Sequence, residues 1–293
     1  MNDENADTPA EHFLETRHGR VRYYRHEGVG TPVIFVNGGP GMPANPYRGR
    51  NYGIRNTMFM YDQSGTGGSD PAGNIDDYSL EYFVDELEDV ITGLGLERFS
   101  LYGSSWGSSI VLGFMSGHLD DERIDRVILG SPLVSARIWN GDQQHNIAEM
   151  PDDIGRILMN GTDHVLTDDT YWDAYMEYMI RYMSPGMTKE EAWGFFDREI
   201  SEIYGMLCGN SEIECGGKLK DIDLSGVLRE IRNKTLVYCG DRDEVRVETA
   251  SGFRKELPNG ELAVIPGSGH HIEGFRVTIL GNIINGFLDD GPR

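Results

Sequence analysis

The sequence predicts an α/β protein in which a mostly parallel sheet carries helices on both faces and is interrupted by an inserted helical cap. Near both ends of the chain, short apolar runs of strand type alternate with segments of helical periodicity, which is the pattern of a sheet buried between helices. Between them the alternation stops, and the chain is rich in Tyr, Met and acidic helical stretches. We therefore expect residues 1–131 and 231–293 to form the core and residues 132–230 to form the cap.

The first part of the expected core begins with a hairpin and continues with alternating strands and helices. Leu80–Leu94 has apolar residues at positions 80, 83, 84, 87, 90, 91 and 94, which is helical periodicity. Ser79 can cap this helix, because its hydroxyl can accept a first-turn N–H. Strands are expected at His12–Arg17, Val21–Arg25, Pro32–Val36, Thr57–Tyr61, Phe99–Tyr102 and Arg126–Leu129, and a further helix at Ser108–Met115.

The second part of the core follows the cap and repeats the same alternation. Lys234–Cys239 and Glu261–Ile265 have the apolar, β-branched character of buried strands. Helices are expected near Glu248–Leu257 and over Val277–Leu288. A short polar loop follows each of the two strands, and both loops contain residues that can carry chemistry.

The composition excludes some partners. The 293 residues include 26 Lys and Arg against 48 Asp and Glu, a net charge of −22, so the chain repels phosphate backbones and nucleic acid is not an expected partner. This charge suits a substrate with a positive amine, and it equally suits simple solubility.

The acidic N-terminus has no apolar signal region, and no apolar stretch reaches membrane-spanning length. Three cysteines without metal spacing agree with a reduced cytoplasm, which is the expected location.

Gly103-Ser104-Ser105-Trp106-Gly107 is a G-x-S-x-G sequence between an expected strand and an expected helix. This context is typical of a nucleophile elbow, a turn so tight that its flanking positions favour glycine. The turn lifts the central serine above the sheet edge and lets the N–H of the next residue face a developing oxyanion. We expect Ser105 to be a nucleophile and the Trp106 N–H to be an oxyanion donor.

A serine nucleophile needs a base, and the base needs an acid that orients it. In a strand–elbow–helix protein of this kind the acid and then the histidine follow the serine along the chain. The loop after Lys234–Cys239 offers Asp241, Asp243 and Glu244 as the acid. The loop after Glu261–Ile265 offers His270 and His271 as the base.

A second oxyanion donor is expected in the glycine-rich loop after Pro32–Val36. This loop has the sequence Asn37-Gly38-Gly39-Pro40-Gly41, and its glycines allow the backbone to approach a substrate carbonyl closely. A phosphate-binding loop is the competing interpretation, but the lysine and the spacing of such a loop are missing.

Several of these motifs together resemble the proline iminopeptidases and related aminopeptidases of the α/β-hydrolase fold, including the archaeal tricorn-interacting aminopeptidase. Asn37–Met42 is similar to the HGGPG loop of that family, and Tyr61–Ser69 to its DQxGxGxS segment. Gly103–Gly107 matches its elbow, Gly240–Asp243 its acid loop and Gly269-His270 its histidine loop. The resemblance spans residues 20–290 and is weakest in the first half of the cap.

The resemblance implies site residues one by one. The catalytic triad becomes Ser105, Asp243 and His270, and the oxyanion donors become Gly39 and Trp106. Two acidic residues that hold the free amine of the substrate also have counterparts. Glu212 lies in a segment similar to the G-P-x-E-F segment of the family's cap, with Glu214 as its rival, and Glu244 directly follows the acid.

The sequence departs from the family at Asn37, where members have His, and at Ser64 and Gly68, where many have Arg. Asn210 stands where the proline of the cap motif is usual. The predicted function is a serine aminopeptidase that releases an N-terminal residue, proline or another, from small peptides or amides through an acyl-enzyme. The alternative is an amidase or esterase that acts on small aminoacyl compounds with the same triad. Neither needs a metal ion or an organic cofactor.

Overall fold

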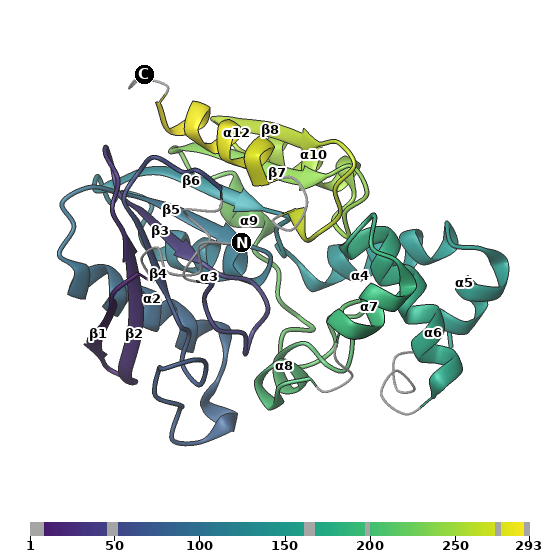
Figure 1. Cartoon of the computed structure of the whole chain (residues 1–293). Helices are drawn as coiled ribbons and strands as arrows, with labels where there is room; N and C mark the ends of the chain where they lie inside the picture. Colours follow the sequence, from purple (N-terminus) through teal and green to yellow (C-terminus); the bar gives the residue numbers. More distant parts are fainter. Residues whose placement is uncertain (1–8, 46–51, 161–167, 197–199, 273–276, 290–293) are drawn as a thin grey trace, which may run out of the picture.

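The computed structural model describes residues 9–45, 52–160, 168–196, 200–272 and 277–289 (Figure 1). They form an eight-stranded sheet in the order β1-β2-β4-β3-β5-β6-β7-β8. β1 with β2 and β2 with β4 pair antiparallel, and all later pairings are parallel. The predicted α/β fold with a mostly parallel sheet is confirmed. The strands are β1 Glu11–Thr16, β2 Gly19–His26, β3 Val33–Val36, β4 Met58–Tyr61, β5 Phe99–Ser104, β6 Ile124–Gly130, β7 Lys234–Gly240 and β8 Gly260–Ile265.

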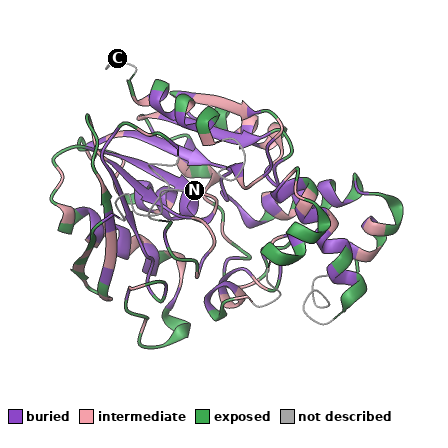
Figure 2. Cartoon of the chain, in the orientation of Figure 1, coloured by how far each residue is buried: buried purple, intermediate pink, exposed green. Residues whose placement is uncertain are grey.

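Helices cover both faces of the sheet, as expected. Successive side chains of a strand point to opposite faces, and in β3 Ile34 and Val36 join one apolar cluster while Val33 and Phe35 join another. The first cluster includes residues of α2, α3, α9 and α10, and the second includes residues of α12. Figure 2 shows the central strands buried between these layers. These helices are α2 Leu80–Leu94, α3 Trp106–Gly117, α9 Ser225–Leu228, α10 Val247–Glu256 and α12 Val277–Asp289.

The helix α2 has the bounds that its apolar periodicity predicts. The hydroxyl of Ser79 accepts a hydrogen bond from the N–H of Tyr82 at 3.2 Å, so the predicted cap is present. Gly95 ends the helix in the left-handed conformation, with φ of 60°, which a glycine adopts at little cost.

A group of helices lies between β6 and β7. Figure 1 shows them beyond one side of the sheet, and several pack around an apolar centre of their own that includes Trp172, Tyr175 and Met176. We propose that residues 132–230 form the cap, and note that α9, near the end of this range, contacts α3. The remaining helical segments are η1 Ile75–Asp77, α4 Ala136–Ala148, α5 Asp152–Leu158, α6 Asp169–Tyr178, η3 Met179–Met183, α7 Lys189–Phe195 and α8 Glu202–Leu207.

Candidate active site

Ser105 lies in the sharp turn between β5 and α3 and has a positive φ of 53°. Such a backbone is unfavourable for a residue with a side chain, and it persists only where the surrounding structure holds it. The two flanking glycines explain the tightness of the turn. A Cβ atom at Gly103 would overlap the backbone of Gly107, and one at Gly107 would overlap the carbonyl of Val36 in β3.

The structure brings Ser105 together with one histidine and one carboxylate from the loops after β8 and β7. The Nε2 atom of His270 lies 3.0 Å from the Ser105 hydroxyl oxygen, and its Nδ1 atom lies 2.8 Å from Asp243 Oδ1. Asp243 also accepts hydrogen bonds from Ser131 Oγ at 2.5 Å and from the N–H of Gly240 at 2.9 Å. The carboxylate is therefore fixed in position, and it fixes the imidazole.

The other candidates for acid and base have different contacts. Asp241 accepts hydrogen bonds from the N–H groups of Gly267 and Ser268, which closes the loop after β8. His271 has its Nδ1 atom 3.3 Å from the Ser184 hydroxyl. The position of the loop left both histidines open, and the family resemblance favoured His270, which is the one whose hydrogen bond reaches Ser105.

Burial and neighbouring charges act in opposite directions on His270. Burial alone would lower its pKa, but Asp243, Glu244 and Glu212 raise the pKa to about 9. The imidazole edge also meets the Trp139 ring, with 5.6 Å between the ring centres. The acidic groups around His270 therefore favour its protonated form, the form that arises when it takes a proton from a serine.

The glycine-rich loop after β3 lies beside Ser105, and Gly39 and Trp106 line the same small cavity as Ser105. The Asn37 side chain donates to the carbonyl groups of Gly38 and Met42, at 3.1 and 2.9 Å. The asparagine that replaces the family's histidine thus holds the loop through its own amide.

Gln63 is a site residue that the sequence analysis included in a motif but gave no role. Its amide nitrogen donates to the carbonyl of Asn37 at 2.9 Å, and its amide oxygen accepts from the Trp106 indole N–H at 3.1 Å. The side chain is fully buried. Gln63 therefore connects the two segments that carry the expected oxyanion donors. In the sequence, the only sign of this role is that Gln63 follows Asp62 in the segment similar to DQxGxGxS.

Glu244 lies next to the histidine, and its carboxylate faces the imidazole as an ion pair. Its Oε2 atom is 3.8 Å from His270 Nδ1, and neither oxygen has a hydrogen-bond partner among the described residues. Its backbone carbonyl, in contrast, accepts from Gln143 and Asn146 of α4. Burial raises the pKa of Glu244 well above its ordinary value; His270 opposes this shift, and Glu212 adds to it.

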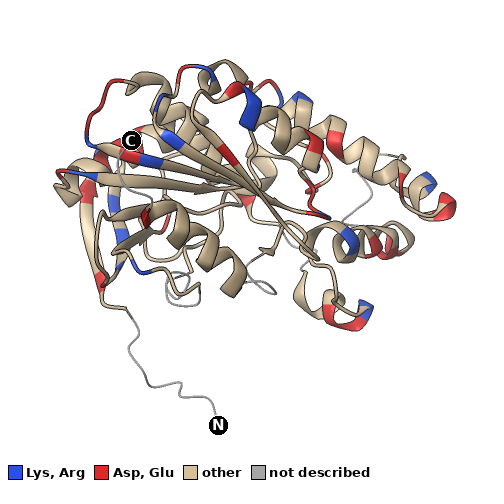
Figure 3. Cartoon of the chain, turned by 90° about the horizontal axis from the view of Figure 1, so that it is seen from above, with Lys and Arg blue, Asp and Glu red and all other residues tan. Residues whose placement is uncertain are grey.

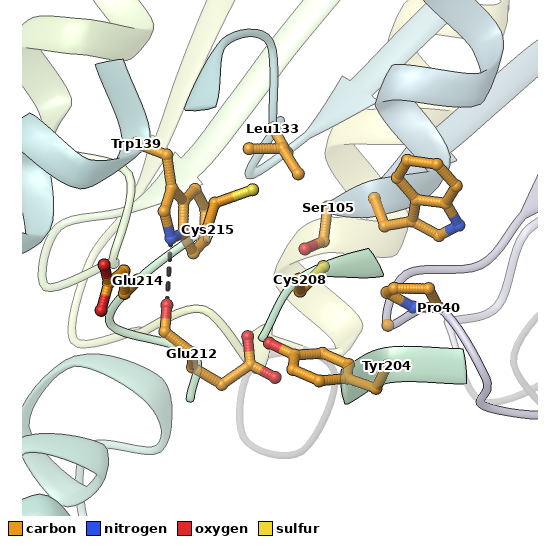
Figure 4. Close-up of a pocket in the computed structure, with 11 residues that line it drawn as sticks. Pro40, Ser105, Leu133, Trp139, Tyr204, Cys208, Glu212, Glu214 and Cys215 are labelled. Atoms are coloured by element: carbon orange, nitrogen blue, oxygen red, sulfur yellow. Dashed lines mark hydrogen bonds between the residues drawn. The ribbon is translucent and has the colours of Figure 1, made fainter. Parts of the chain in front are cut away.

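Glu212 approaches the same place from the cap. Its N–H donates to the Tyr175 hydroxyl at 3.2 Å and its carbonyl accepts from the Trp139 indole at 3.0 Å. Figure 4 shows its carboxylate close to the Tyr204 hydroxyl, on the Ser105 side of the cavity, whereas the carboxylate of Glu214 points away from Ser105. Burial raises the pKa of Glu212, and His270 opposes this shift.

The cavity beside Ser105 has a volume of about 30 Å³. Leu133, Trp139 and Tyr204 form apolar walls, and the thiols of Cys208 and Cys215 face it as well. The cavity thus combines a serine, apolar walls and a carboxylate. Within the part of the chain that the structure describes, no three His, Cys, Asp or Glu side chains are grouped so that they could hold a metal ion, and no helix is long and apolar enough to cross a membrane.

A serine in a strand–turn–helix elbow, with a carboxylate after one later strand and a histidine after the next, is the arrangement of hydrolases built on a parallel sheet. A sequence model of the alpha/beta hydrolase fold matches residues 31–177, half of the chain. The protein belongs to the alpha/beta hydrolase fold family.

Similar proteins confirm the resemblance that the motifs indicate. A proline iminopeptidase of Heyndrickxia coagulans is 28% identical, over 89% of this chain and 92% of its own. The crystal structure of a proline iminopeptidase from Mycobacterium smegmatis superposes with a TM-score of 0.81 at 22% identity, over 95% of this chain and 97% of the other. A non-heme chloroperoxidase, CPO-A1 of Kitasatospora aureofaciens, is 26% identical over 88% of this chain and 91% of its own. The chain is thus similar both to proteins named as peptidases and to one named as a chloroperoxidase.

Proposed function

We propose that the protein is a serine aminopeptidase that releases the N-terminal residue, proline or another, often apolar, amino acid, from small peptides or amides. One observation carries the proposal. Two carboxylates from separate parts of the chain, Glu212 and Glu244, lie beside the hydrogen-bonded Ser105, His270 and Asp243, and both oxygens of Glu244 lack a hydrogen-bond partner in the described structure. The names of the similar proline iminopeptidases support the same activity.

In the proposed reaction, His270 takes the proton of Ser105 as the hydroxyl oxygen attacks the carbonyl carbon of residue one. Asp243 holds the imidazole in the tautomer that can accept this proton and stabilises the imidazolium that forms. The N–H groups of Gly39 and Trp106 bind the oxyanion. His270 then gives the proton to the leaving nitrogen, and an acyl-enzyme forms. Water, activated by the same histidine, releases the amino acid and restores Ser105.

Glu212 and Glu244 have the role of binding the free α-ammonium group of the substrate. A buried carboxylate without a partner is costly, and a cation that enters the site removes this cost. Burial is the main cause that raises the pKa values of Glu212 and Glu244, and it reflects the same cost. An ammonium held there places the carbonyl of residue one, and no later carbonyl, at Ser105. Cleavage is thereby limited to the first residue.

The test uses aminoacyl-naphthylamides with and without N-acetylation. Glu212→Gln and Glu244→Gln should each lower kcat/KM for the free-amine substrates by about 10- to 150-fold, because a charge-assisted hydrogen bond contributes about 1.5–3 kcal/mol. Nitrophenyl acetate, which has no amine, should be hydrolysed at nearly the wild-type rate. Glu214→Gln is the matched control: Glu214 also lines the cavity and lies two residues from Glu212, but its carboxylate points away from Ser105.

Ser105→Ala serves as the second control in this experiment. It should lower kcat by about 10⁴-fold or more on every substrate and should abolish labelling by a fluorophosphonate probe. If N-acetylated substrates are cleaved as fast as free ones, or both Gln variants behave like the wild type, the aminopeptidase proposal is wrong. The alternative, an amidase or esterase with the same triad, would then apply.

A further inference from the structure

A second and larger cavity lies next to the one at Ser105. It has a volume of about 410 Å³, within the range of small-molecule sites. Pro40, Tyr204 and Glu212 line both cavities, so the two are neighbours across these side chains. The proposed reaction uses only the smaller cavity, which Ser105 lines and whose volume is about 30 Å³.

The walls of the larger cavity are mostly apolar and come from the cap. They include Trp172 and Tyr175 of α6, Met179 of η3, and Phe195 at the end of α7. Phe195 is 59% exposed, and Met42 of the glycine-rich loop, which also lines the cavity, is 55% exposed. Exposed apolar side chains around a concave surface mark a place where an apolar group can be covered.

The charges along this cavity disfavour an anion. Among the described residues that line it, none is a lysine or arginine, and the only titratable groups apart from tyrosines are Glu212 and His271. Among the described lining residues, a carboxylate that entered the cavity would meet no lysine or arginine and would face Glu212, with the His271 imidazole as the one group that can become a cation. The C-terminal carboxylate of a dipeptide or tripeptide lies within a few bonds of the scissile amide. The larger cavity therefore does not suit the free end of a short peptide.

The position of the larger cavity relative to the triad indicates which part of a substrate would reach it. His270 must give its proton to the leaving nitrogen, so the leaving group lies on the histidine side of the scissile bond. His271, the next residue in the chain, lines the larger cavity. Glu212, proposed to hold the ammonium group, lies between the two cavities. A substrate whose first residue occupies the small cavity would therefore extend its leaving group into the large one.

We propose, on the basis of the function inferred above, that the larger cavity binds the leaving group and that this group is bulky, apolar and uncharged. The substrate class is then an aminoacyl amide of an aryl or long alkyl amine, or a peptide blocked at its C-terminus, rather than a short free peptide.

The first test varies only the leaving group. The first residue is the one that reacts best as a naphthylamide, and it is joined to methylamine, butylamine, hexylamine and octylamine. Because each buried methylene contributes about 0.8 kcal/mol, kcat/KM should rise about two- to fourfold per added methylene until the cavity is full. A dipeptide with phenylalanine in second place and its C-terminal amide form a matched pair. The amide should react at least about tenfold faster.

The second test places a cation at the rim of the cavity. Phe195→Arg should shift the preference within the matched pair toward the free dipeptide by about tenfold or more. Phe13→Arg is the control, since Phe13 is also an exposed aromatic residue, 46% exposed in β1, and is not among the residues that line the cavity. It should leave the ratio unchanged. Phe195 is exposed, so we expect the variant to fold, and its thermal unfolding temperature verifies this.

The proposal is overturned if kcat/KM does not depend on the length of the alkyl amine, if the free dipeptide and its amide react equally in the wild type, or if Phe13→Arg and Phe195→Arg change the ratio alike. It is also overturned if the size of the first residue, and not of the leaving group, determines the rate. These outcomes differ from a failure of the proposed function. In that failure N-acetylation would have no effect, while the dependence on the leaving group could remain.

Discussion

Single amide side chains hold the parts of the site together. Gln63 donates to the carbonyl of Asn37 and accepts from the indole of Trp106, and Asn37 in turn holds Gly38 and Met42. The expected oxyanion donors, at Gly39 and Trp106, belong to two segments far apart in the sequence. Gln63 fixes the distance between these segments, so we regard it as a positioning residue.

Gln63→Leu should lower kcat by about tenfold or more with little change in KM, because misaligned donors weaken binding of the oxyanion and not of the ground state. Gln63→Glu keeps an acceptor for the Trp106 indole and should retain more activity than the leucine variant. Steady-state kinetics with a free-amine naphthylamide measure both effects. An increase in KM alone, with kcat unchanged, would contradict the positioning role.

The two adjacent histidines should differ in their effect on the reaction. His270 reaches both Ser105 and Asp243, whereas the ring of His271 lies near Ser184 and the Phe196 ring. His270→Ala should therefore lower kcat by about 10³-fold or more, and His271→Ala should keep most of the acylation rate. Rapid-mixing measurements of acylation distinguish the two. The reverse result would move the base by one residue.

At the scale of elements, α2 carries a buried acid on the face that packs against the core. Glu86 is fully buried and accepts a hydrogen bond from the N–H of Ser64 at 3.0 Å. Burial raises its pKa to about 8, although hydrogen bonds from Ser64 oppose the shift. Glu86 thereby joins the helix to the segment that follows β4, next to Gln63.

Glu86 should make the stability of the protein depend on pH. In the unfolded chain this acid loses its proton near its ordinary pKa of 4.5, but in the folded protein near 8. Between these values the folded state binds more protons, so its contribution to the free energy of unfolding falls as pH rises, by at most about 1.4 kcal/mol per pH unit.

Glu86→Gln removes this contribution. The free energy of unfolding of the variant minus that of the wild type should therefore increase from pH 5 to pH 8. Urea unfolding at several pH values measures the difference. Glu81→Gln, at an exposed position of the same helix, should follow the wild type. Parallel curves for Glu86→Gln and the wild type would show that Glu86 is ionised in the folded protein.

At the scale of the whole molecule, the core and the cap both contribute acidic groups to one histidine. Asp243 and Glu244 come from the loop after β7, and Glu212 comes from the cap, yet all three raise the pKa of His270. Figure 3 shows acidic residues spread over both parts of the chain, with basic ones among them. The overall charge of −22 therefore does not by itself create this group of acids. The fold brings them together.

The pH dependence of kcat/KM should show the effect of these three acidic groups on His270. His270 must be neutral to accept the serine proton, and its pKa of about 9 means that kcat/KM should rise as pH increases through this range. In Glu212→Gln one of the groups that raise the pKa is lost, so the rise should move to lower pH. Nitrophenyl acetate is the substrate to use, because it does not depend on amine binding. If kcat/KM of Glu212→Gln rises at the same pH as that of the wild type, or at a higher pH, Glu212 does not raise the pKa of His270.

The sequence by itself determined the order and type of the core elements. Buried parallel strands need continuous apolar runs and amphipathic helices need a 3.6-residue period, so Leu80–Leu94 and the strands around Ser105 were recognisable locally. The serine of the elbow was equally local, because only small flanking residues such as Gly103 and Gly107 fit the turn. The sequence also limited the candidates for the catalytic acid and the catalytic base to two short loops.

The spacing of the strands and loops left His270 and His271 open, and the family resemblance favoured His270 and Asp243. Only the tertiary structure gave these residues contacts different from those of His271 and Asp241, because adjacent residues in a loop have no periodicity that predicts their direction. It also brought Glu212 of the cap to Glu244 and connected Gln63 to Asn37 and Trp106. These contacts join residues tens of positions apart, and they depend on how the sheet, its loops and the cap pack. Such packing is a property of the folded chain as a whole, and no local pattern of residues encodes it.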